Sequence, residues 1–543
     1  MIDRAAARLG ALALGAALVG LAGMPVAAQV PADEEFVGPP RSADDMAADG
    51  RDLALAAEAP EIDFSQPVAG LEDAIRRAYW HNPDILAERA RKRSVDFRLP
   101  QARALYGPRV DYQLEYGYRR DRIELTPDRY RTASGWSGTV SAIVDQPILT
   151  FGRLAANEHR AQAEIGFQRE SLRFTEQQTI FAAIQAYVGV LRDRNAVRIA
   201  QDNFALLERE LGDTRLRQAA RETTIVDLQQ VVSRHELAAA ELAIAQGNMA
   251  TSEGRFVAVI GSAPAAEMAP PNPLLLPVRT LDDAIDIALD DNPLISAAQF
   301  REQVSRAAFH AAAAERRPRI DLRGRADLAP VSPYDDRLRQ NSIIGQVVVS
   351  GPLFTSGLLE SRQAEAKAAN DADWRLVDAA RRDLIAEVTG AWSSWQATGD
   401  ALDNLEAAVV AARAAYDGAV LQQKAGFRTT LDVLILAREL LTLRTSLNSA
   451  EANSYLAQAQ ILSALGMLDV PYLMPAEPAY DADAHLEKVD GYGSMIPLTP
   501  ILRTFDGLYA VDTGPRPTRD ATIGAIEEAG LEEAEAVSPA SED

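Results

Sequence analysis

The chain has 543 residues, of which 47% are hydrophobic and 6% aromatic, and it carries a formal net charge of −23. This acidic balance argues against nucleic acid as a partner. There is no cysteine, which excludes disulfides, thiolate metal sites, a cysteine nucleophile and a lipid-modified N-terminal cysteine. No nucleotide loop, metal cluster or nucleophile with its base is visible either, so we expect no cofactor, no metal and no enzymatic activity.

Residues 1–28 have the pattern of a secretory signal peptide. Arg4 and Arg8 precede an apolar run that is too short to span a bilayer, and Val26-Ala27-Ala28 fits a small-residue cleavage site. The segment 29–68 is acidic, with scattered prolines and no periodicity, so we expect a disordered arm. After the N-terminus there is no apolar run of about eighteen residues, so no membrane-spanning helix is expected.

The middle of the chain is a tandem duplication. The segment 71–75 (LEDAI) recurs as 281–285 (LDDAI), and 108–111 (PRVD) recurs as 318–321 (PRID), both at an offset of 210 residues. Further on the offset falls to 205, and a loop between the paired strands can absorb the difference. The resulting first repeat, proline-rich linker and second repeat occupy residues 69–263, 264–280 and 281–467.

Each repeat contains two stretches that alternate like an amphipathic β-strand. From Val110 to Tyr118, apolar or aromatic side chains alternate with polar ones or glycine, which puts one chemistry on each face. A tilted strand of about nine to eleven residues also crosses the hydrocarbon layer of a bilayer. The other stretches are 136–144, 320–328 and 343–349, of which the last has a weak polar face. One such strand alone suits a soluble sheet, but four within a helical chain favour a membrane sheet.

Most of the remaining sequence is typical of helices. Helices are expected to start at Leu71 and Leu281, and each is followed, past an Asn-Pro pair, by a helix that runs to Leu105 or Glu315.

After each return strand comes a helical run, at 154–218 and 358–423, that would measure roughly 98 Å if unbroken. A helix then returns with apolar or small side chains three and four residues apart, which is the spacing of a coiled-coil seam. His235 lies on this seam, and we expect it to be a packing residue.

Export, amphipathic strands and the lack of a spanning helix point to the outer membrane of a Gram-negative bacterium, where a closed β-barrel is the spanning solution. Such barrels need at least about eight strands, so two or three copies of this chain must share one barrel. The expected fold class is therefore mainly α with a small membrane β part: tandem coiled-coil helical hairpins plus four strands per chain in a shared barrel. The alternation predicts these lipid-facing side chains: Tyr112, Leu114, Tyr116, Trp136 and Val140.

This architecture and the segment 425–434 (AGFRTTLDVL) resemble the TolC family of outer-membrane efflux and secretion channels, over about residues 69–470. The resemblance implies a homotrimer with a 12-stranded barrel in outer-membrane lipid and a long periplasmic helical tunnel. It also implies that the chain docks on a periplasmic membrane-fusion adaptor and an inner-membrane pump of the RND or ABC type, and that it catalyses nothing. Drugs, small molecules or secreted protein would pass through it to the exterior.

The resemblance assigns roles to residues at the periplasmic helix tips. Asp432, Arg428 and Asp227 would form the periplasmic gate, with Arg428 holding the tip closed and Asp432 facing the constriction. The residues that would dock the adaptor are Arg221, Thr223, Gly426, Phe427 and Thr429. Taken alone, Asp432 and Arg428 suit an ordinary helix start, in which the aspartate caps the helix or complements its dipole.

Three positions depart from the family pattern. Ile435 stands where some members carry a second aspartate in the lumen, and Gln423 stands where a tyrosine joins the closed contact. Arg221 takes the place that glycine has in the second-repeat tip. We therefore expect an acidic ring with fewer carboxylates and a gate held by a different set of contacts.

The two C-terminal segments carry little pattern. Residues 468–512 have a few apolar positions and would wrap the helices as an equatorial collar, and residues 513–543 form an acidic tail that we expect to be disordered. The alternative function is a soluble or peripheral coiled-coil adaptor or scaffold in the periplasm, with the strands as a small soluble domain. Drug efflux and type I secretion cannot be distinguished from this sequence, because the pump selects the cargo.

Overall fold

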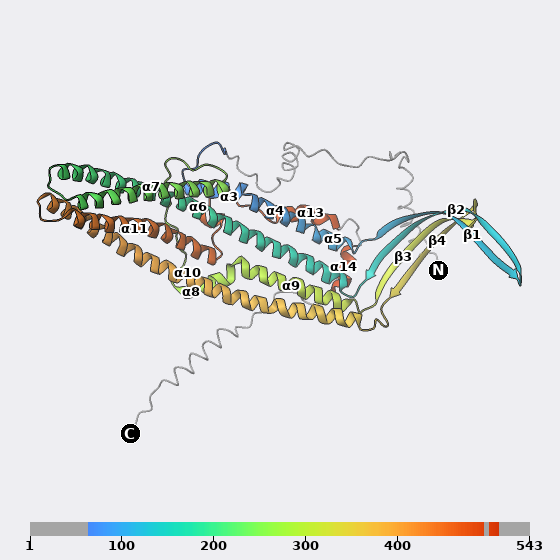
Figure 1. The fold of residues 1–543 in the computed structure, drawn as a ribbon. Helices are drawn as coiled ribbons and strands as arrows, with labels where there is room; N and C mark the ends of the chain where they lie inside the picture. Colours follow the sequence, from blue (N-terminus) through green and yellow to red (C-terminus); the bar gives the residue numbers. More distant parts are fainter. Residues whose placement is uncertain (1–62, 494–498, 510–543) are drawn as a thin grey trace, which may run out of the picture.

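The computed structural model describes residues 63–493 and 499–509, which form an elongated molecule (Figure 1). A sheet lies at one end, and long helices extend from it to two helical tips at the other end. The predicted signal peptide, most of the predicted arm 29–68 and the predicted tail 513–543 lie outside the described residues.

Four antiparallel strands form one sheet in the order β1-β2-β3-β4. Their bounds are β1 Arg109–Thr126, β2 Arg129–Leu149, β3 Arg319–Ser332 and β4 Asp335–Ser350. The alternation predicted a part of each strand, and every strand continues from the predicted stretch towards the turn of its hairpin. β1 and β4 are the edges of this sheet, and each presents a row of unpaired backbone groups.

The strand register brings the main apolar rows of the four strands to one face of the sheet, while Ile143, Ile344 and Val348 lie on the opposite face. Leu114 pairs with Val140, which pairs in turn with Leu328 of β3. Leu322 of β3 pairs with Val347 of β4. Side chains of directly paired residues point to the same face. This also settles the orientation of β4, whose own alternation is weak.

The helices of the two repeats correspond one to one, apart from an additional break in the first. The first repeat contains α3 Leu71–His81, α4 Pro83–Asp96, α5 Arg98–Ala104, α6 Arg153–Ala219 and α7 Ile225–Ile260. The second contains α8 Leu281–Asp291, α9 Pro293–Ala314, α10 Leu358–Lys424 and α11 Thr430–Ala464. The predicted long helices are confirmed to within one residue at each end.

The prediction of one helix from Pro83 to Leu105 is wrong, because the chain breaks at Phe97 between α4 and α5. Pro100 has no N–H and cannot donate to the carbonyl four residues earlier, so the helical ladder is interrupted there. The second repeat has His310 at the equivalent position, and α9 continues without a break.

The predicted arm is also wrong at its C-terminal end. Val68 is fully buried, and its N–H donates to the carbonyl of Ala263 (3.0 Å). Arg77 donates to the carbonyl of Gln66 (2.9 Å). The predicted linker contributes to the core as well, since Val278 is buried against α8 and α10. Residues 63–68 therefore belong to the packed structure of the first repeat.

α6 and α10 are equivalent helices of 67 residues each, but they differ in burial. α6 lies among α4, α5, α7 and α9 and buries side chains along most of its length. α10 contacts α8, α9 and α11 and leaves one face open, where Val410 is 70% and Leu421 68% exposed. Since β4 leads into α10, the free edge of the sheet continues into this open helical face (Figure 1).

The C-terminal segment lies along the first repeat. It contains α12 Val470–Leu473, α13 Ala484–Val489, the 3₁₀ turn Asp490–Gly493 and α14 Thr499–Gly507. Near its start, Arg76 of α3 donates to Glu477 (2.8 Å), and the N–H of Tyr480 donates to the hydroxyl of Tyr79 (3.0 Å).

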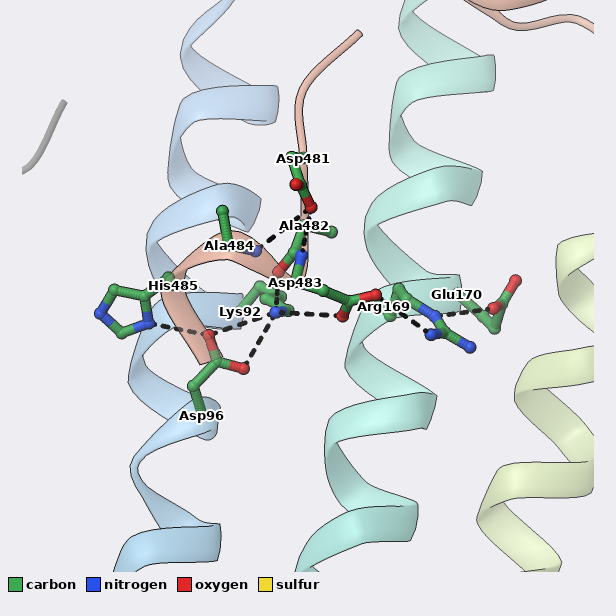
Figure 2. A network of polar contacts seen from close by, with 9 residues as sticks. All are labelled: Lys92, Asp96, Arg169, Glu170, Asp481, Ala482, Asp483, Ala484 and His485. Carbon is green, nitrogen blue, oxygen red and sulfur yellow. Dashed lines mark hydrogen bonds and ion pairs between the residues drawn. The ribbon is translucent and has the colours of Figure 1, made fainter. Parts of the chain in front are cut away.

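A buried ion pair on α4 is completed by this segment (Figure 2). Lys92 and Asp96 are fully buried, with 3.1 Å between Nζ and Oδ1. Lys92 also donates to the carbonyl of Ala482, and Nδ1 of His485 lies 2.8 Å from Oδ2 of Asp96. The partners from this segment offset part of the desolvation cost of burying two charges.

Charge explains why the segment follows the first repeat. Lys92 and Asp96 correspond to Glu302 and Arg306 in the second repeat, which form a buried pair of the opposite order (3.1 Å). Arg76, which holds Glu477, corresponds to an aspartate at position 286. An acidic segment in the same place on the second repeat would therefore meet like charges.

At its other end the segment caps α6. Asp506 is 1% exposed, and its carboxylate accepts the N–H and the hydroxyl of Thr150 (2.8 and 2.9 Å). It also accepts the N–H groups of Gly152 and Ala155, both at 3.2 Å. The N-cap residue, Gly152, has no side chain for this purpose, so a distant residue satisfies the helix start.

We predict that Asp506→Ala destabilises this junction by about 1–3 kcal/mol, because it leaves buried donors at the start of α6 unpaired. Hydrogen exchange of the first-turn amides of α6 would measure the loss. Asp483→Ala is the matched control, since it removes an acid of the same segment whose side chain is 51% exposed. Equal protection of these amides in both variants would contradict the capping role.

Candidate functional site

The two tips, between α6 and α7 and between α10 and α11, share one design (Figure 1). In the second tip the N–H of Phe427 donates to the carbonyl of Gln422 (2.9 Å), and Gly426 has a φ of +80°. This is the glycine-dependent end of an α-helix. The first tip has the same geometry with Arg221 at a φ of +64°, which costs a non-glycine residue about 1–2 kcal/mol.

A capping box opens the returning helix of each tip. Oδ2 of Asp432 accepts the hydroxyl (2.8 Å) and the N–H (3.1 Å) of Thr429, and the N–H of Asp432 donates back to that hydroxyl (3.2 Å). Asp227 is held in the same way by Thr224, with a further bond from Thr223 (3.0 Å). The helix-start geometry that was the alternative interpretation of Asp432 is therefore present, and Asp227 has the same geometry.

These hydrogen bonds favour the ionised carboxylates. The bond from the Thr429 hydroxyl, followed by that from its N–H, lowers the pKa of Asp432, and the bonds from Thr224 lower the pKa of Asp227. Each folded-state pKa lies below the unfolded value. The contribution of these carboxylates to folding stability is therefore present above the unfolded pKa and is lost as the pH falls through the folded-state pKa. Both aspartates are therefore ionised at neutral pH.

Arg428 and Gln423, the other tip residues considered for the gate, form hydrogen bonds within the second tip, and Gln423 also contacts α6. Arg428 is exposed, and its Nε donates to Oε1 of Gln422 (2.8 Å). Gln423 donates to Thr430 (3.2 Å) and to Glu210 of α6 (3.4 Å). In the described part of this chain no ion pair joins Arg428 to the first tip, so the gate assignment remains a prediction.

The predicted docking residues lie on the surface of both tips. Phe427 is 83% exposed, Arg221, Gly426 and Thr429 are exposed, and Thr223 is half-buried. Beneath them a small apolar cluster joins the two tips, formed by Leu207, Leu211, Val231, Ala238 and Leu434. His235 packs near this cluster, with its ring 4.9 Å from that of Phe204.

The apolar face of the sheet is exposed in the single chain, and it includes all five predicted lipid-facing residues. Their exposed fractions run from 40% for Val140 to 79% for Tyr112. Tyr116 stacks on Trp136, with ring centroids 5.5 Å apart. The opposite face carries paired charges, such as Arg323 with Asp145 (3.0 Å).

The described residues include no grouping of three or more side chains able to hold a metal ion. Among the described helices, none has the length and apolar character needed to cross a membrane.

The sequence analysis missed the contacts made by the C-terminal segment, including the cap from Asp506. A signal was present: Thr150-Phe151-Gly152 recurs as Thr355-Ser356-Gly357, which marks two equivalent helix starts. The sequence around the start of α6 does not show which side chain accepts the N–H groups of that helix start. No local pattern connects Asp506 to a helix that begins far away in the chain.

Comparison with known proteins gives consistent matches. The family model for outer membrane efflux proteins matches residues 74–262 and 284–467, which are the two repeats. The outer membrane efflux protein BepC of Brucella suis is 26% identical over 77% of this chain and 90% of its own. The outer membrane protein TolC of Escherichia coli is 20% identical over 83% of this chain and 92% of its own.

Solved structures share the fold. The outer membrane protein VceC of Vibrio cholerae matches with a TM-score of 0.63 at 20% identity, over 73% of this chain and 96% of its own. The open state of the MtrE outer membrane channel of Neisseria gonorrhoeae matches with a TM-score of 0.63 at 17% identity, over 75% of this chain and 94% of its own.

Proposed function

We propose that this chain, which belongs to the outer membrane efflux protein family, works as a homotrimer that receives substrates from a periplasmic adaptor and an inner-membrane pump. The protein is an outer-membrane efflux channel with a helical tunnel in the periplasm. Proteins of this family are channels rather than enzymes. Family membership favours the channel over the alternative of a periplasmic adaptor.

The strand register carries this proposal. The main apolar rows of the four strands share one face, and both sheet edges are open. In lipid an open edge leaves backbone N–H and C=O groups unsatisfied, so the edges must pair with other copies. Three copies give a twelve-stranded barrel, with β4 of one copy next to β1 of the following copy. The open face of α10 would then lie against the first repeat of that copy.

We predict that Leu114→Arg destabilises the assembled barrel by about 2–4 kcal/mol per chain, because it places a charge in lipid. Gln113→Arg, one residue away on the opposite face, should be mild. The resistance of the trimer to heating in mild detergent measures both. If the two variants dissociated at the same temperature, the assigned faces would be wrong.

The helix tips are the proposed contact with the adaptor. They are the part of the molecule farthest from the sheet (Figure 1). They expose Phe427 and Arg221 above a small apolar cluster. With the sheet in the outer membrane, the tips point into the periplasm, where an adaptor can reach them.

We predict that single cysteines at Thr223 or Thr429 crosslink to the adaptor, whereas a cysteine at Thr139 within the sheet does not. The chain has no native cysteine, so each crosslink reports one position. Crosslinking of trimers in intact cells, followed by identification of the joined partner, measures this. Crosslinks from Thr139 alone would exclude docking at the tips.

The gate is proposed at the same tips. Trimeric symmetry turns one lumen-facing Asp432 per chain into three carboxylates around the axis. The capping bonds engage Oδ2 and keep the group ionised, while Oδ1 stays available to a passing cation. A ring of acids at a constriction attracts cations and repels anions.

We predict that Asp432→Asn lowers cation selectivity and weakens block by multivalent cations in planar-bilayer recordings. Asp227→Asn is the comparator, because Asp227 has the same capping geometry in the first repeat. Arg428→Ser should raise conductance with little change in selectivity, by loosening the tip. Unchanged selectivity in trimeric Asp432→Asn channels would leave this aspartate with its capping role only.

A further inference from the structure

The apolar face of β1 changes character near the far end of the sheet. Tyr116 and Tyr118 point to this face, and the next two residues in the same alternation are Arg120 and Arg122. Arg120 lies ten residues after Val110, about 33 Å along the strand at 3.3 Å per residue. At a tilt of about 40° this corresponds to a height of about 25 Å, the height of the apolar band of an outer-membrane barrel. Arg120 and Arg122 therefore lie just above that band.

The other edge strand shows the same change. On β4, Val347 and Ile343 share the apolar face through their pairing with Leu322 and Ala326. The next side chains on this face, towards the turn, are those of Asn341, Arg339 and Arg337. Both edges of the sheet thus end their apolar stretch in two arginines.

Charge pairing distinguishes these arginines from most of those on the polar face, where, among the described residues, Arg129 and Arg131 near the turn are the exceptions. On that face five arginines each contact a carboxylate, at 2.7–3.0 Å: Arg109, Arg119, Arg319, Arg323 and Arg325.

On the outward face, Arg120, Arg122 and Arg337 form no ion pair with a described residue, and Arg339 reaches Asp336 only at 3.5 Å. Arg122 lies over the ring of Tyr130, 4.1 Å from its centroid. Glu124, the next acid on this face, accepts the N–H of Asp128 within the turn (3.3 Å). Arg120, Arg122 and Arg337 of the apolar face therefore present charge that no described carboxylate of the sheet neutralises, and Arg339 is paired only loosely.

We propose that Arg337 and Arg339 of one copy and Arg120 and Arg122 of the next form an anion site at each subunit seam, which binds the phosphate groups of an outer-leaflet lipid. The site rests on the proposed trimer, because β4 and β1 become neighbours only in the closed ring. Three such sites would encircle the barrel.

The position of the seam and the chemistry of arginine select this ligand. The helices are periplasmic, so the opposite end of the sheet lies at the outer leaflet. The aromatic pair Tyr116 and Trp136 marks the depth at which a bilayer passes from hydrocarbon to headgroups. Guanidinium groups bind phosphate oxygens in bidentate pairs, which makes arginine well suited to a phosphorylated headgroup.

The test uses purified full-length trimers and lipid A as the probe. Diphosphorylated lipid A, dephosphorylated lipid A and inorganic phosphate are titrated separately, and the temperature of trimer dissociation is measured. We expect diphosphorylated lipid A alone to raise this temperature. The paired variants Arg120→Gln/Arg122→Gln and Arg337→Gln/Arg339→Gln should each weaken its apparent affinity about tenfold or more, which corresponds to the loss of at least one charge-assisted bond.

The matched control is Arg129→Gln/Arg131→Gln, which removes the same charge from the same hairpin but from its polar face, and it should keep the wild-type affinity. An equal shift with dephosphorylated lipid A or with inorganic phosphate would overturn the lipid site, as would equal weakening in the control. If trimers assemble and conduct ions but show either of these results, the lipid site is wrong and the proposed function still stands. A wild-type chain that forms no trimer would reject the proposed function instead.

Discussion

The unpaired edges of the four-stranded sheet are the constraint on which the rest of the structure depends. Backbone groups can remain unpaired in water but not in hydrocarbon, so β1 and β4 need partners in a membrane, which identical copies would supply in the proposed trimer. Each strand pair is joined to a long helical hairpin, so closing the sheet also brings the helices together. The poorly covered face of α10, in contrast to the well-buried α6, follows from the same requirement. The free edge at β4 and the exposed face of α10 are therefore adjacent in the molecule.

The two repeats have diverged by exchanging charges at corresponding positions. Lys92 and Asp96 face the C-terminal segment, whereas Glu302 and Arg306 form a reversed pair within the second repeat. A duplicated structure offers two similar grooves to one acidic segment, and an attractive pair in one groove with a repulsive arrangement in the other is enough to direct it. The same segment then supplies Asp506 to the start of α6, so its selective binding also stabilises the junction between helix and sheet.

The sequence predicted the parts of the fold that depend on periodicity. The four strands, the long helices and the duplication follow from spacings of two, of three and four, and of 205 to 210 residues. It failed where one residue or a distant contact decides: Pro100 divides a helix, Val68 extends the packed structure into the predicted arm, and Asp506 caps a helix that it does not precede. Among the candidate site residues, the alternation in the sequence predicted which strand side chains share the apolar face of the sheet. The gate stays a prediction, because in the described part of this chain Arg428 contacts Gln422 of its own helical hairpin and no ion pair links it to the first tip.

The tips show how a structural role and a functional role can reside in one side chain. Asp432 and Asp227 open their helices with the same bonds, so capping alone explains why an aspartate stands at both positions. Capping does not distinguish them, however, and their surroundings do. Asp432 follows a glycine-containing turn with Arg428 two residues beyond the glycine, whereas Asp227 follows a turn in which Arg221 is held in a left-handed conformation. The second tip therefore makes its turn without strain, whereas the first carries the cost of an arginine in the left-handed region. The two tips thus share their capping bonds and differ in the turn that precedes them.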